Sequence, residues 1–451
     1  MTRARQGTSE LLRGLVHGGA GLLALTLKFL SVPEAALVAA AAVVFNLAVL
    51  PLLGARLFRD GERRLPLGSG IHLYPFAVLI LVLVFGWRME VAAAGWVIMA
   101  AGDPAARAAG MTFGGRRVPW NRSKTLIGTA AFAVAAFAAT FGILVYMGRE
   151  AAEAAILAAP TALFAAFVES LPWRLNDNLT VPLLSALFLC GLVEAQATRL
   201  PEILPALGRP FATAVVVNAV LAVVFRWTGT VDRSGMAAGF AVGVLTWSFG
   251  GPPAFALLIA FFVLGSATTR LGRARKERLG VAQGKTGARS ARHAIANCGV
   301  AVYLVILAST APAPALFLAA FVAAYATATF DTVSSEIGQA WGGRPVMITT
   351  LRRVAVGTDG AVSLLGTLAG FGGALVVAGL ARALGLIAPA AIPIVLVGAF
   401  IGSSADSLLV ATLERRGLMD NEAVNFSNTL VGALAAAAGA LLVAATRGAA
   451  G

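Results

Sequence analysis

The 451-residue chain is hydrophobic at 59% of its positions and charged at only 12%, about half the charged share of an ordinary soluble domain. No soluble fold could bury that much apolar surface, so the composition excludes a soluble globular protein. The three histidines exclude a histidine-rich metal site, and the two cysteines have no metal-binding or redox spacing. The composition predicts an all-α, polytopic integral membrane protein.

Lysine and arginine number 35 against 21 aspartates and glutamates, which gives a net charge of +14. The excess gathers in the connections between apolar runs, where the positive-inside rule makes it an orientation signal. An even number of predicted spans separates successive basic clusters, so all of them fall on one face of the membrane. We expect this face to be cytoplasmic, and we expect no nucleic-acid partner.

Apolar runs long enough to cross a roughly 30 Å hydrocarbon core recur along the whole chain. We predict roughly fifteen spans in two halves, and we expect no β-strands because the interruptions are too irregular for barrel alternation. A proline-rich stretch near residue 205 ends one helix and restarts another, which predicts domains 1–204 and 205–451. In chain order, the predicted spans cover residues 14–30, 34–53, 74–87, 91–105, 126–147, 153–170, 182–199, 209–226, 236–249, 253–269, 296–311, 313–330, 361–380, 387–409 and 427–446.

The densest polar motif of the first half, GDPAARAAGMTFGGRRVPWNRSKTLIGT, covers residues 102–129 between two predicted spans. Asp103 could hold Mg²⁺, while Arg116, Asn121 and Lys124 could bind a polyphosphate. The paired glycines of the motif would let the backbone approach that phosphate. The alternative interpretation is a basic loop that only orients the protein.

Two further polar groups of the first half fall on the same predicted face. Near the start of the chain, Arg13 and His17 follow a glutamate at the spacing i, i+3 and i+7, so one helix stripe carries all three. Glu169 ends a later span, and Asp177 and Asn178 stand just before the next one. Oxygen ligands of this kind suit Mg²⁺, which takes few protein ligands and keeps substrate phosphates and water.

Residues 9–200 resemble the phytol kinase and dolichol kinase family, which is related to CDP-diacylglycerol synthases. The resemblance rests on the Glu/Arg/His start, on the stretch GD...A...G...FG...P.N..KT..G, and on the stretch E...DN..VP. It implies transfer of the γ-phosphate of CTP, or of another nucleoside triphosphate, to a long-chain prenol with Mg²⁺. One departure is Gly14, where the family pattern has a lysine after the arginine.

The second half carries its own acidic and hydroxyl groups. Asp331, Ser335 and Glu336 stand at the end of an apolar span, and Asp406 with Ser407 lies in a later one. An acidic side chain left in lipid near the bilayer centre costs roughly 2.5 to 3.5 kcal/mol. These acids must therefore line a polar or interfacial site.

Glycines, amides and basic residues of the second half accompany these acids. Thr358 and Gly360 belong to the stretch GTDG, whose backbone NH groups could cradle a phosphate. Asn425 begins the final span, and a basic loop between two spans contains Lys276 and Arg289. The alternatives are helix packing for the small and hydroxylated residues and an orientation signal for the basic ones.

Residues 210–446 resemble the integral membrane family that includes plant phytyl-phosphate kinase. The matching pattern is DT..SE.G....P..ITT.....GT.G..S..GT, followed by G...DS and VNF...T..GA, and the basic loop matches at Lys276, Arg289 and Asn297. The resemblance implies addition of a second phosphate to a prenyl monophosphate. His293 and Cys298 depart from the pattern, where glutamine and glycine are expected.

Together the two resemblances imply consecutive steps, from prenol to monophosphate and then to diphosphate. We expect Mg²⁺ near the four aspartates Asp103, Asp177, Asp331 and Asp406, a prenol lipid and CTP or ATP as substrates, and an active-site face toward the cytoplasm. Three alternatives stay open: a transporter or lipid flippase, a cytidylyltransferase that forms a CDP-lipid, and activity in only one half.

Overall fold

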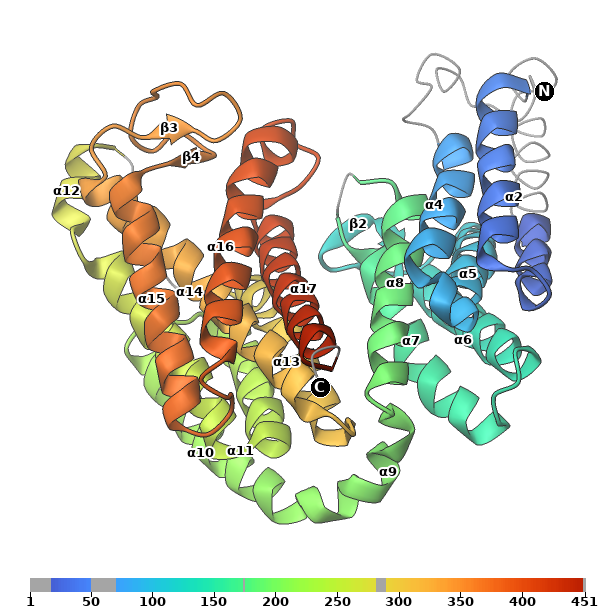
Figure 1. Ribbon diagram of the computed structural model, residues 1–451, viewed down its shortest axis with the longest axis horizontal. Coiled ribbons are helices and arrows are strands. Elements are labelled where there is room, and N and C mark those ends of the chain that lie inside the picture. Colours follow the sequence, from blue (N-terminus) through green and yellow to red (C-terminus); the bar gives the residue numbers. More distant parts are fainter. Residues whose placement is uncertain (1–17, 50–69, 173–174, 281–288, 449–451) are drawn as a thin grey trace. The chain divides into compact units, whose positions relative to one another are not determined.

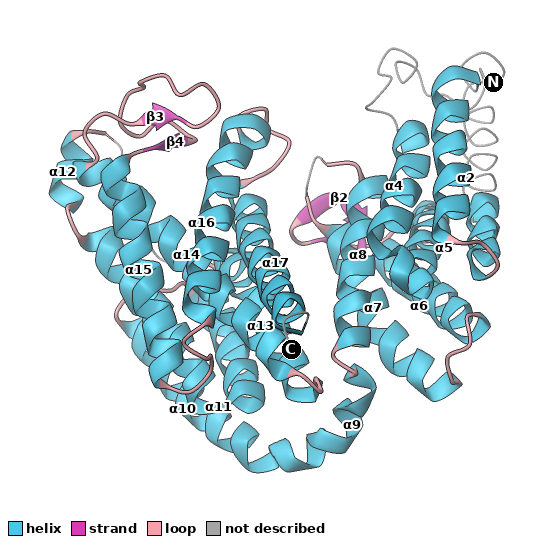
Figure 2. Ribbon diagram, in the orientation of Figure 1, coloured by secondary structure: helices cyan, strands magenta, loops and turns pink. Residues whose placement is uncertain are grey.

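The computed structural model describes residues 18–49, 70–172, 175–280 and 289–448. Helices make up nearly all of these ranges (Figure 2), which confirms the predicted all-α class. Within these ranges, twelve helical segments are long and apolar enough to cross a membrane. The protein is therefore a polytopic, integral membrane helical protein.

The twelve segments are fewer than the fifteen predicted spans, and two long segments account for part of the difference. Residues His72–Phe113 form one segment of 42 residues, and Arg233–Arg270 form one of 38 residues. A straight helix of that length would rise about 60 Å, twice the hydrocarbon thickness, so each must contain a break. Each covers two of the predicted spans, and the predicted first span, residues 14–30, lies partly outside the described residues.

The chain divides into two compact units, residues 1–198 and 199–451. The elements of unit 1 follow in chain order (Figure 1): η1 Leu22–Lys28, α2 Val32–Val44, η2 Phe45–Val49, α4 Gly70–Phe85, η5 Gly86–Arg88, α5 Met89–Phe113, β1 Arg117–Val118, β2 Asn121–Thr125, α6 Leu126–Tyr146, α7 Ala151–Ser170, α8 Asp177–Glu194 and η6 Ala197–Arg199, whose last residue belongs to unit 2. In this unit, α5 packs against α4, α6 and α8, and α6 and α7 pack around a core that contains Ile98 and Phe132.

Unit 2 is built around α14, Pro314–Trp341, which packs against α11, α13, α15, α16 and α17. Alanines dominate the buried part of α14, and such small residues let neighbouring helices approach closely. The other elements of unit 2 are α9 Leu200–Ile203, η7 Leu204–Leu207, α10 Gly208–Trp227, α11 Arg233–Arg270, α12 Arg273–Arg278, α13 Ala291–Thr310, β3 Val346–Met347, β4 Ala361–Val362, α15 Leu364–Ala383, α16 Ala391–Leu409, η8 Val410–Glu414 and α17 Asn421–Gly448.

Two short antiparallel hairpins correct the expectation that the chain has no strands. β1 pairs with β2 in unit 1, and β3 pairs with β4 in unit 2. Both hairpins connect long helices, so they reflect local turn chemistry rather than barrel alternation. Each one stands beside residues that the sequence analysis placed in a functional site.

The helix α11 folds back on itself at Gly251, whose φ of 68° and ψ of −174° are not helical. Only glycine adopts this conformation readily, and Pro252 and Pro253 follow it directly. Gly235 near one end of α11 and Gly265 near the other both lie against Arg289. A straight helix would separate these glycines by about 45 Å, so α11 is a hairpin of two arms.

Candidate functional site

Three helices of unit 2 meet closely around Thr327 of α14. A β-carbon built on Gly402 of α16 would lie 2.5 Å from Thr327 Cγ2, and one built on Gly432 of α17 would lie 2.1 Å from Thr327 Oγ1. No larger residue fits at either glycine without moving the helices. Residues one turn away from this contact therefore face one another.

The acids of unit 2 stand one helical turn from that contact. Asp331 follows Thr327 by four residues, and Asp406 follows Gly402 by four. The two half-buried carboxyl groups are within hydrogen-bonding reach of each other. Asn428 Nδ2 donates to Asp406 Oδ1 at 2.8 Å, and Ser403 Oγ lies 3.4 Å from Asp331 Oδ1.

This acidic centre, formed by Asp331, Asp406, Ser403 and Asn428, has no basic partner in the part of the chain that the structure describes. No described Lys, Arg or His nitrogen lies within 4.0 Å of either carboxylate. Two carboxylates in contact repel each other unless a proton or a cation lies between them. The centre is thus electrostatically suited to a cation.

The donor set of the acidic centre fits Mg²⁺, which prefers oxygen ligands and usually takes one or two carboxylates beside phosphate oxygens and water. Across the described residues, no group of three or more His, Cys, Asp or Glu side chains could hold a metal ion. A magnesium ion at Asp331 and Asp406 would therefore depend on the phosphates of a bound substrate for the rest of its coordination.

A buried ion pair involves Glu336, which follows Asp331 by five residues on α14. Lys276 of α12 binds Glu336 through its ammonium group and also donates to the carbonyl oxygen of Thr269 at 2.9 Å. The Lys276 and Glu336 side chains are only 3% and 8% exposed. The structure thus gives Lys276, predicted to bind phosphate, one protein partner on α14 and one on α11.

The loop that precedes β4 reaches the same end of α16 as the acidic centre. A β-carbon on Gly360, at φ +76°, would lie 2.8 Å from Ser407 O and 2.6 Å from Ala411 Cβ, so only glycine lets the loop pack there. Thr358 Oγ1 donates to Ala355 O at 2.7 Å and stays within this loop. The structure therefore brings Thr358, Gly360 and Ser407 together.

The remaining predicted residues of unit 2 differ in their surroundings. Ser335 is exposed and its Oγ donates to Thr332 O at 3.1 Å, one turn back along α14. Asn425 is 9% exposed and lies on α17 one turn before Thr429, whose hydroxyl donates to its backbone oxygen. Arg289 lies at the end of a cavity beside α11, apart from the contacts of the acidic centre.

In unit 1 the hairpin β1–β2 brings Lys124 against the ends of α7 and α8. Lys124 Nζ lies 2.5 Å from Glu169 Oε1 and 2.9 Å from Asp177 Oδ2. Burial lowers the pKa of Lys124, but the charges of Asp177 and Glu169 outweigh it and raise that pKa above its ordinary value. Lys124 is therefore a cation held by two carboxylates.

Asp103 of α5 stands beside this group of charges. Arg107 Nη2 lies 3.2 Å from Asp103 Oδ2, and both side chains act electrostatically on Asp177. The structure thus unites Asp103, Asp177, Glu169 and Lys124 in one cluster. Because each of these carboxylates already has Lys124 or Arg107 as a basic partner, the cluster as it stands fits a metal ion less well than the acidic centre of unit 2 does.

Other predicted residues of unit 1 support the hairpin or lie at its surface. Asn121 Nδ2 donates to Leu171 O at 3.1 Å, and its Oδ1 accepts from the backbone and hydroxyl of Ser123. Arg116 is exposed, and Asn178 lies in the first turn of α8. The predicted residues Arg13 and His17 lie outside the described residues.

Two members of these sites were not predicted from the sequence, Ser403 and Arg107. Ser403 binds Asp331, and Arg107 pairs with Asp103. Their spacing from predicted residues was a usable signal, because Arg107 follows Asp103 by four positions and Ser403 precedes Asp406 by three. Nothing in the sequence pairs Asn428 with Asp406, since that contact depends on how two helices cross.

The fold and this centre define an integral membrane helical protein with two contacting acids enclosed by packed helices. Residues 216–433 match the family described as integral membrane protein DUF92. An uncharacterized membrane protein of Synechocystis sp., sll0875, is 34% identical over 229 residues, which cover 50% of this chain and 89% of that protein. The chain belongs to this family of integral membrane proteins.

Two plant proteins are similar over shorter shares of their length. Protein VTE6, chloroplastic, of Arabidopsis thaliana is 35% identical over 212 residues, which cover 46% of this chain and 64% of that protein. Probable phytol kinase 3, chloroplastic, of Glycine max is 35% identical over 123 residues, which cover 26% of this chain and 39% of that protein. No solved structure matches the chain.

Proposed function

We propose that this protein is an integral membrane kinase that phosphorylates a long-chain isoprenoid alcohol and its monophosphate. The observation that carries the proposal is the contact between Asp331 and Asp406, two acids without a basic partner among the described residues. The similarity to a plant protein named a probable phytol kinase supports the substrate class. The resemblance of residues 210–446 to the phytyl-phosphate kinase family supports the same activity.

In unit 2 the proposed reaction adds a phosphate to a prenyl monophosphate. A phosphate oxygen of the lipid attacks the γ-phosphorus of a nucleoside triphosphate, and the bond from that phosphorus to the bridging β–γ oxygen breaks. The nucleoside diphosphate leaves with the electron pair of that bond, and the lipid becomes a diphosphate. The Gly360 loop, packed on α16, lies where backbone groups could hold the phosphates.

Asp331 and Asp406 would hold Mg²⁺ in this scheme, with Asn428 orienting Asp406. A bound magnesium ion supplies charge neutralisation for the phosphates in the transition state. The Lys276–Glu336 pair keeps α12 in place at the end of α14. Catalysis of phosphoryl transfer depends mainly on positioning and charge neutralisation, so no protein nucleophile is needed.

In unit 1 we propose the preceding step, in which the hydroxyl of a prenol attacks the same phosphorus and loses its proton to a carboxylate of the Asp103–Asp177 cluster. Lys124 is the cation available to a transferred phosphate, provided that the phosphate competes with Glu169 and Asp177 for it. We propose CTP or ATP as the donor and place both sites on the cytoplasmic face, where nucleotides are present.

The test is transfer of labelled γ-phosphate from CTP or ATP, in membranes that contain the protein, to phytol, geranylgeraniol and their monophosphates. We expect Asp331→Asn to block diphosphate formation and Asp103→Asn to block monophosphate formation, each by about 100-fold or more. Glu202→Gln is the matched control, because its side chain is 69% exposed in a surface ion pair. It is expected to keep full activity.

Two outcomes would contradict the proposal in different ways. If no lipid is labelled under any condition, kinase activity is wrong and transport of a lipid becomes the leading interpretation. If Asp103→Asn leaves monophosphate formation intact, only the assignment of the first step to unit 1 is wrong.

A further inference from the structure

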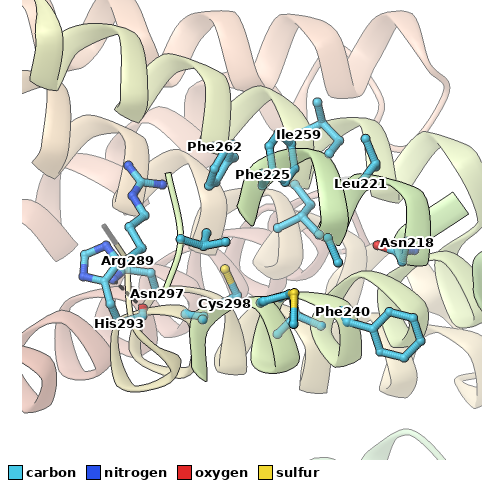
Figure 3. Close-up of a pocket in the computed structure, with 18 of the residues that line it drawn as sticks. Asn218, Leu221, Phe225, Phe240, Ile259, Phe262, Arg289, His293, Asn297 and Cys298 are labelled. Carbon is cyan, nitrogen blue, oxygen red and sulfur yellow. Dashed lines mark hydrogen bonds between the residues drawn. The ribbon is translucent and has the colours of Figure 1, made fainter. Parts of the chain in front are cut away.

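A cavity of about 90 Å³ lies in unit 2 between α10, the two arms of α11 and the start of α13. Its walls are apolar and include Leu221, Phe225, Ile259 and Phe262. Figure 3 shows Arg289, His293 and Asn297 gathered at one end, with Asn218 and Phe240 at the other. The cavity therefore has a polar head and an apolar body.

Two glycines of α11 pack closely against Arg289 and hold it at the polar head. A β-carbon on Gly235 would lie 2.0 Å from Arg289 O, and one on Gly265 would lie 2.7 Å from Arg289 Nη2. The guanidinium group also lies 5.0 Å from the centre of the Phe262 ring and 5.7 Å from that of Phe261. Backbone and side chain of Arg289 are thus both fixed toward the cavity.

The Arg289 guanidinium has no acidic partner among the described residues, because no described carboxylate oxygen lies within 4.0 Å of it. Glu336 acts on its charge from farther away, but Glu336 is bound to Lys276. Burial lowers the pKa of Arg289, although an arginine keeps its charge at any physiological pH. Arg289 is half-buried, and a half-buried cation without a counter-charge is costly, so a ligand anion would relieve that cost.

The start of α13 also favours an anion at the polar head. α13 begins at Ala291, directly after Arg289 and Ser290, and the N-terminus of a helix of 20 residues attracts negative charge. Gly265 also lies beside α14, because its β-carbon would be 3.6 Å from Thr332 Cγ2. Thr332 follows Asp331 in the chain, so the polar head lies at the same level of α14 as the acidic centre but on the neighbouring face of the helix.

We infer that this cavity binds the lipid acceptor, a long-chain prenyl monophosphate, with its phosphate on Arg289 and its isoprenoid chain between the arms of α11. This inference rests on the proposed kinase function and extends it to the lipid site. The phenylalanine walls suit an unsaturated hydrocarbon chain, and the polar head holds the phosphate beside Thr332, at the level of α14 where Asp331 faces α16.

The cavity also predicts how the chain enters. Its lining residues on α10 extend from Asn218 to Phe225, about 10 Å along the helix, so a longer chain must leave through an opening. Gly239 lines the cavity, is exposed, and has no atom within 4 Å of a β-carbon built on it. Gly239 therefore marks an opening through which the end of the chain can reach the lipid bilayer.

The first experiment measures binding of labelled geranylgeranyl monophosphate to the purified full-length protein in detergent, without nucleotide. Arg289→Gln is expected to weaken this binding at least about tenfold and to remove the preference over geranylgeraniol. Gly239→Leu is expected to weaken binding of both long-chain lipids while dimethylallyl monophosphate still binds. The matched controls are Arg382→Gln, an exposed arginine, and Gly379→Leu, whose β-carbon also meets no atom within 4 Å.

A second experiment uses only the wild-type protein, so its result cannot be affected by a variant that fails to fold. A prenyl monophosphate with a diazirine near the end of its chain is expected to label Met236 or Phe240 on irradiation, as mapped by peptide mass spectrometry. Labelling confined to other helices would overturn the inference. So would binding that is unchanged in Arg289→Gln and Gly239→Leu, or a tightly held phospholipid that prenyl monophosphate does not displace.

The failure of this inference can be separated from failure of the kinase proposal. If both variants keep the wild-type KM for prenyl monophosphate in the kinase assay, the lipid acceptor site is elsewhere and the kinase proposal stands. If the wild-type protein binds and is labelled in the cavity but transfers no phosphate, the cavity stands as a prenyl-phosphate site and the kinase proposal fails.

Discussion

Asp331 of α14 and Asp406 of α16 hold their carboxyl groups in contact, while Asn428 of α17 donates to Asp406 at 2.8 Å. The contact exists because Thr327 fits against Gly402 and Gly432 one turn away on each helix. Close packing of small residues thus places two like charges together, which costs stability unless a cation or a proton joins them.

Replacing Asp331 by asparagine is expected to raise the thermal stability of the metal-free protein while it removes kinase activity, because the repulsion between the carboxyl groups disappears. We expect a rise of about 2–4 °C in Tm. Mg²⁺ added together with prenyl monophosphate should stabilise the wild-type protein and not the variant. Thermal unfolding in detergent without either ligand measures the first effect, and unfolding with the lipid present, with and without Mg²⁺, measures the second.

Ser404→Ala serves as the control for this experiment, since Ser404 Oγ only donates to Phe400 O within α16. A variant Asp331→Asn that keeps both the response to Mg²⁺ and the activity would rule out a metal site at the acidic centre.

Loss of one partner of the Lys276–Glu336 ion pair should cost more stability than loss of both partners. Lys276→Met leaves the Glu336 carboxylate buried without a partner and is expected to cost about 3–5 kcal/mol of unfolding free energy. The double variant Lys276→Met/Glu336→Leu should recover most of that loss. Unfolding in mixed micelles by SDS measures all three proteins, and a double variant as unstable as the single one would show that Lys276 has another essential role.

Lys124 should make unit 1 sensitive to alkaline pH. Its pKa in the folded protein is raised above the ordinary value of 10.5, so its contribution to stability is complete below that value and is lost as pH rises through the folded pKa. We expect Tm to fall above about pH 10.5 in the wild-type protein. Lys124→Met should be less stable at neutral pH, because Glu169 is then buried unpaired. Its Tm should also lack the fall at high pH, which we call the alkaline step.

The measurement is Tm as a function of pH in detergent, with Arg149→Met as a comparison. Arg149 forms a different ion pair, with Glu90 at 2.5 Å, so its loss should leave the alkaline step in place. An alkaline step that survives in Lys124→Met would assign it to another group.

The hinge of α11 should tolerate no side chain. Gly251→Ala forces a β-carbon into a backbone conformation that is almost restricted to glycine, with an expected cost of about 1–3 kcal/mol. Since Arg289 contacts both arms of α11, prenyl monophosphate binding should fall together with Tm. Gly379→Ala, in open space on α15, should change neither quantity. Unchanged binding and stability in Gly251→Ala would show that the hinge does not position the cavity.

Several features could be predicted from local sequence because they depend on neighbouring residues. The break in α11 was expected between residues 249 and 253, since glycines and prolines interrupt a helix whatever surrounds it. The groups Asp103 with Lys124 and Asp331 with Glu336 were placed at the ends of apolar runs for the same reason. The short hairpins were missed because strands of two to five residues carry little periodic signal.

The sequence by itself determined that the chain is an all-α membrane protein, because an apolar composition and span-length runs are properties of each segment alone. Tertiary structure decided which polar residues meet. The contact of Asn428 with Asp406, the pairing of Lys276 with Glu336, and the isolation of Arg289 at the head of a cavity all depend on how helices far apart in the chain cross. Helical periodicity specifies which face a residue occupies, but long-range packing decides what that face touches.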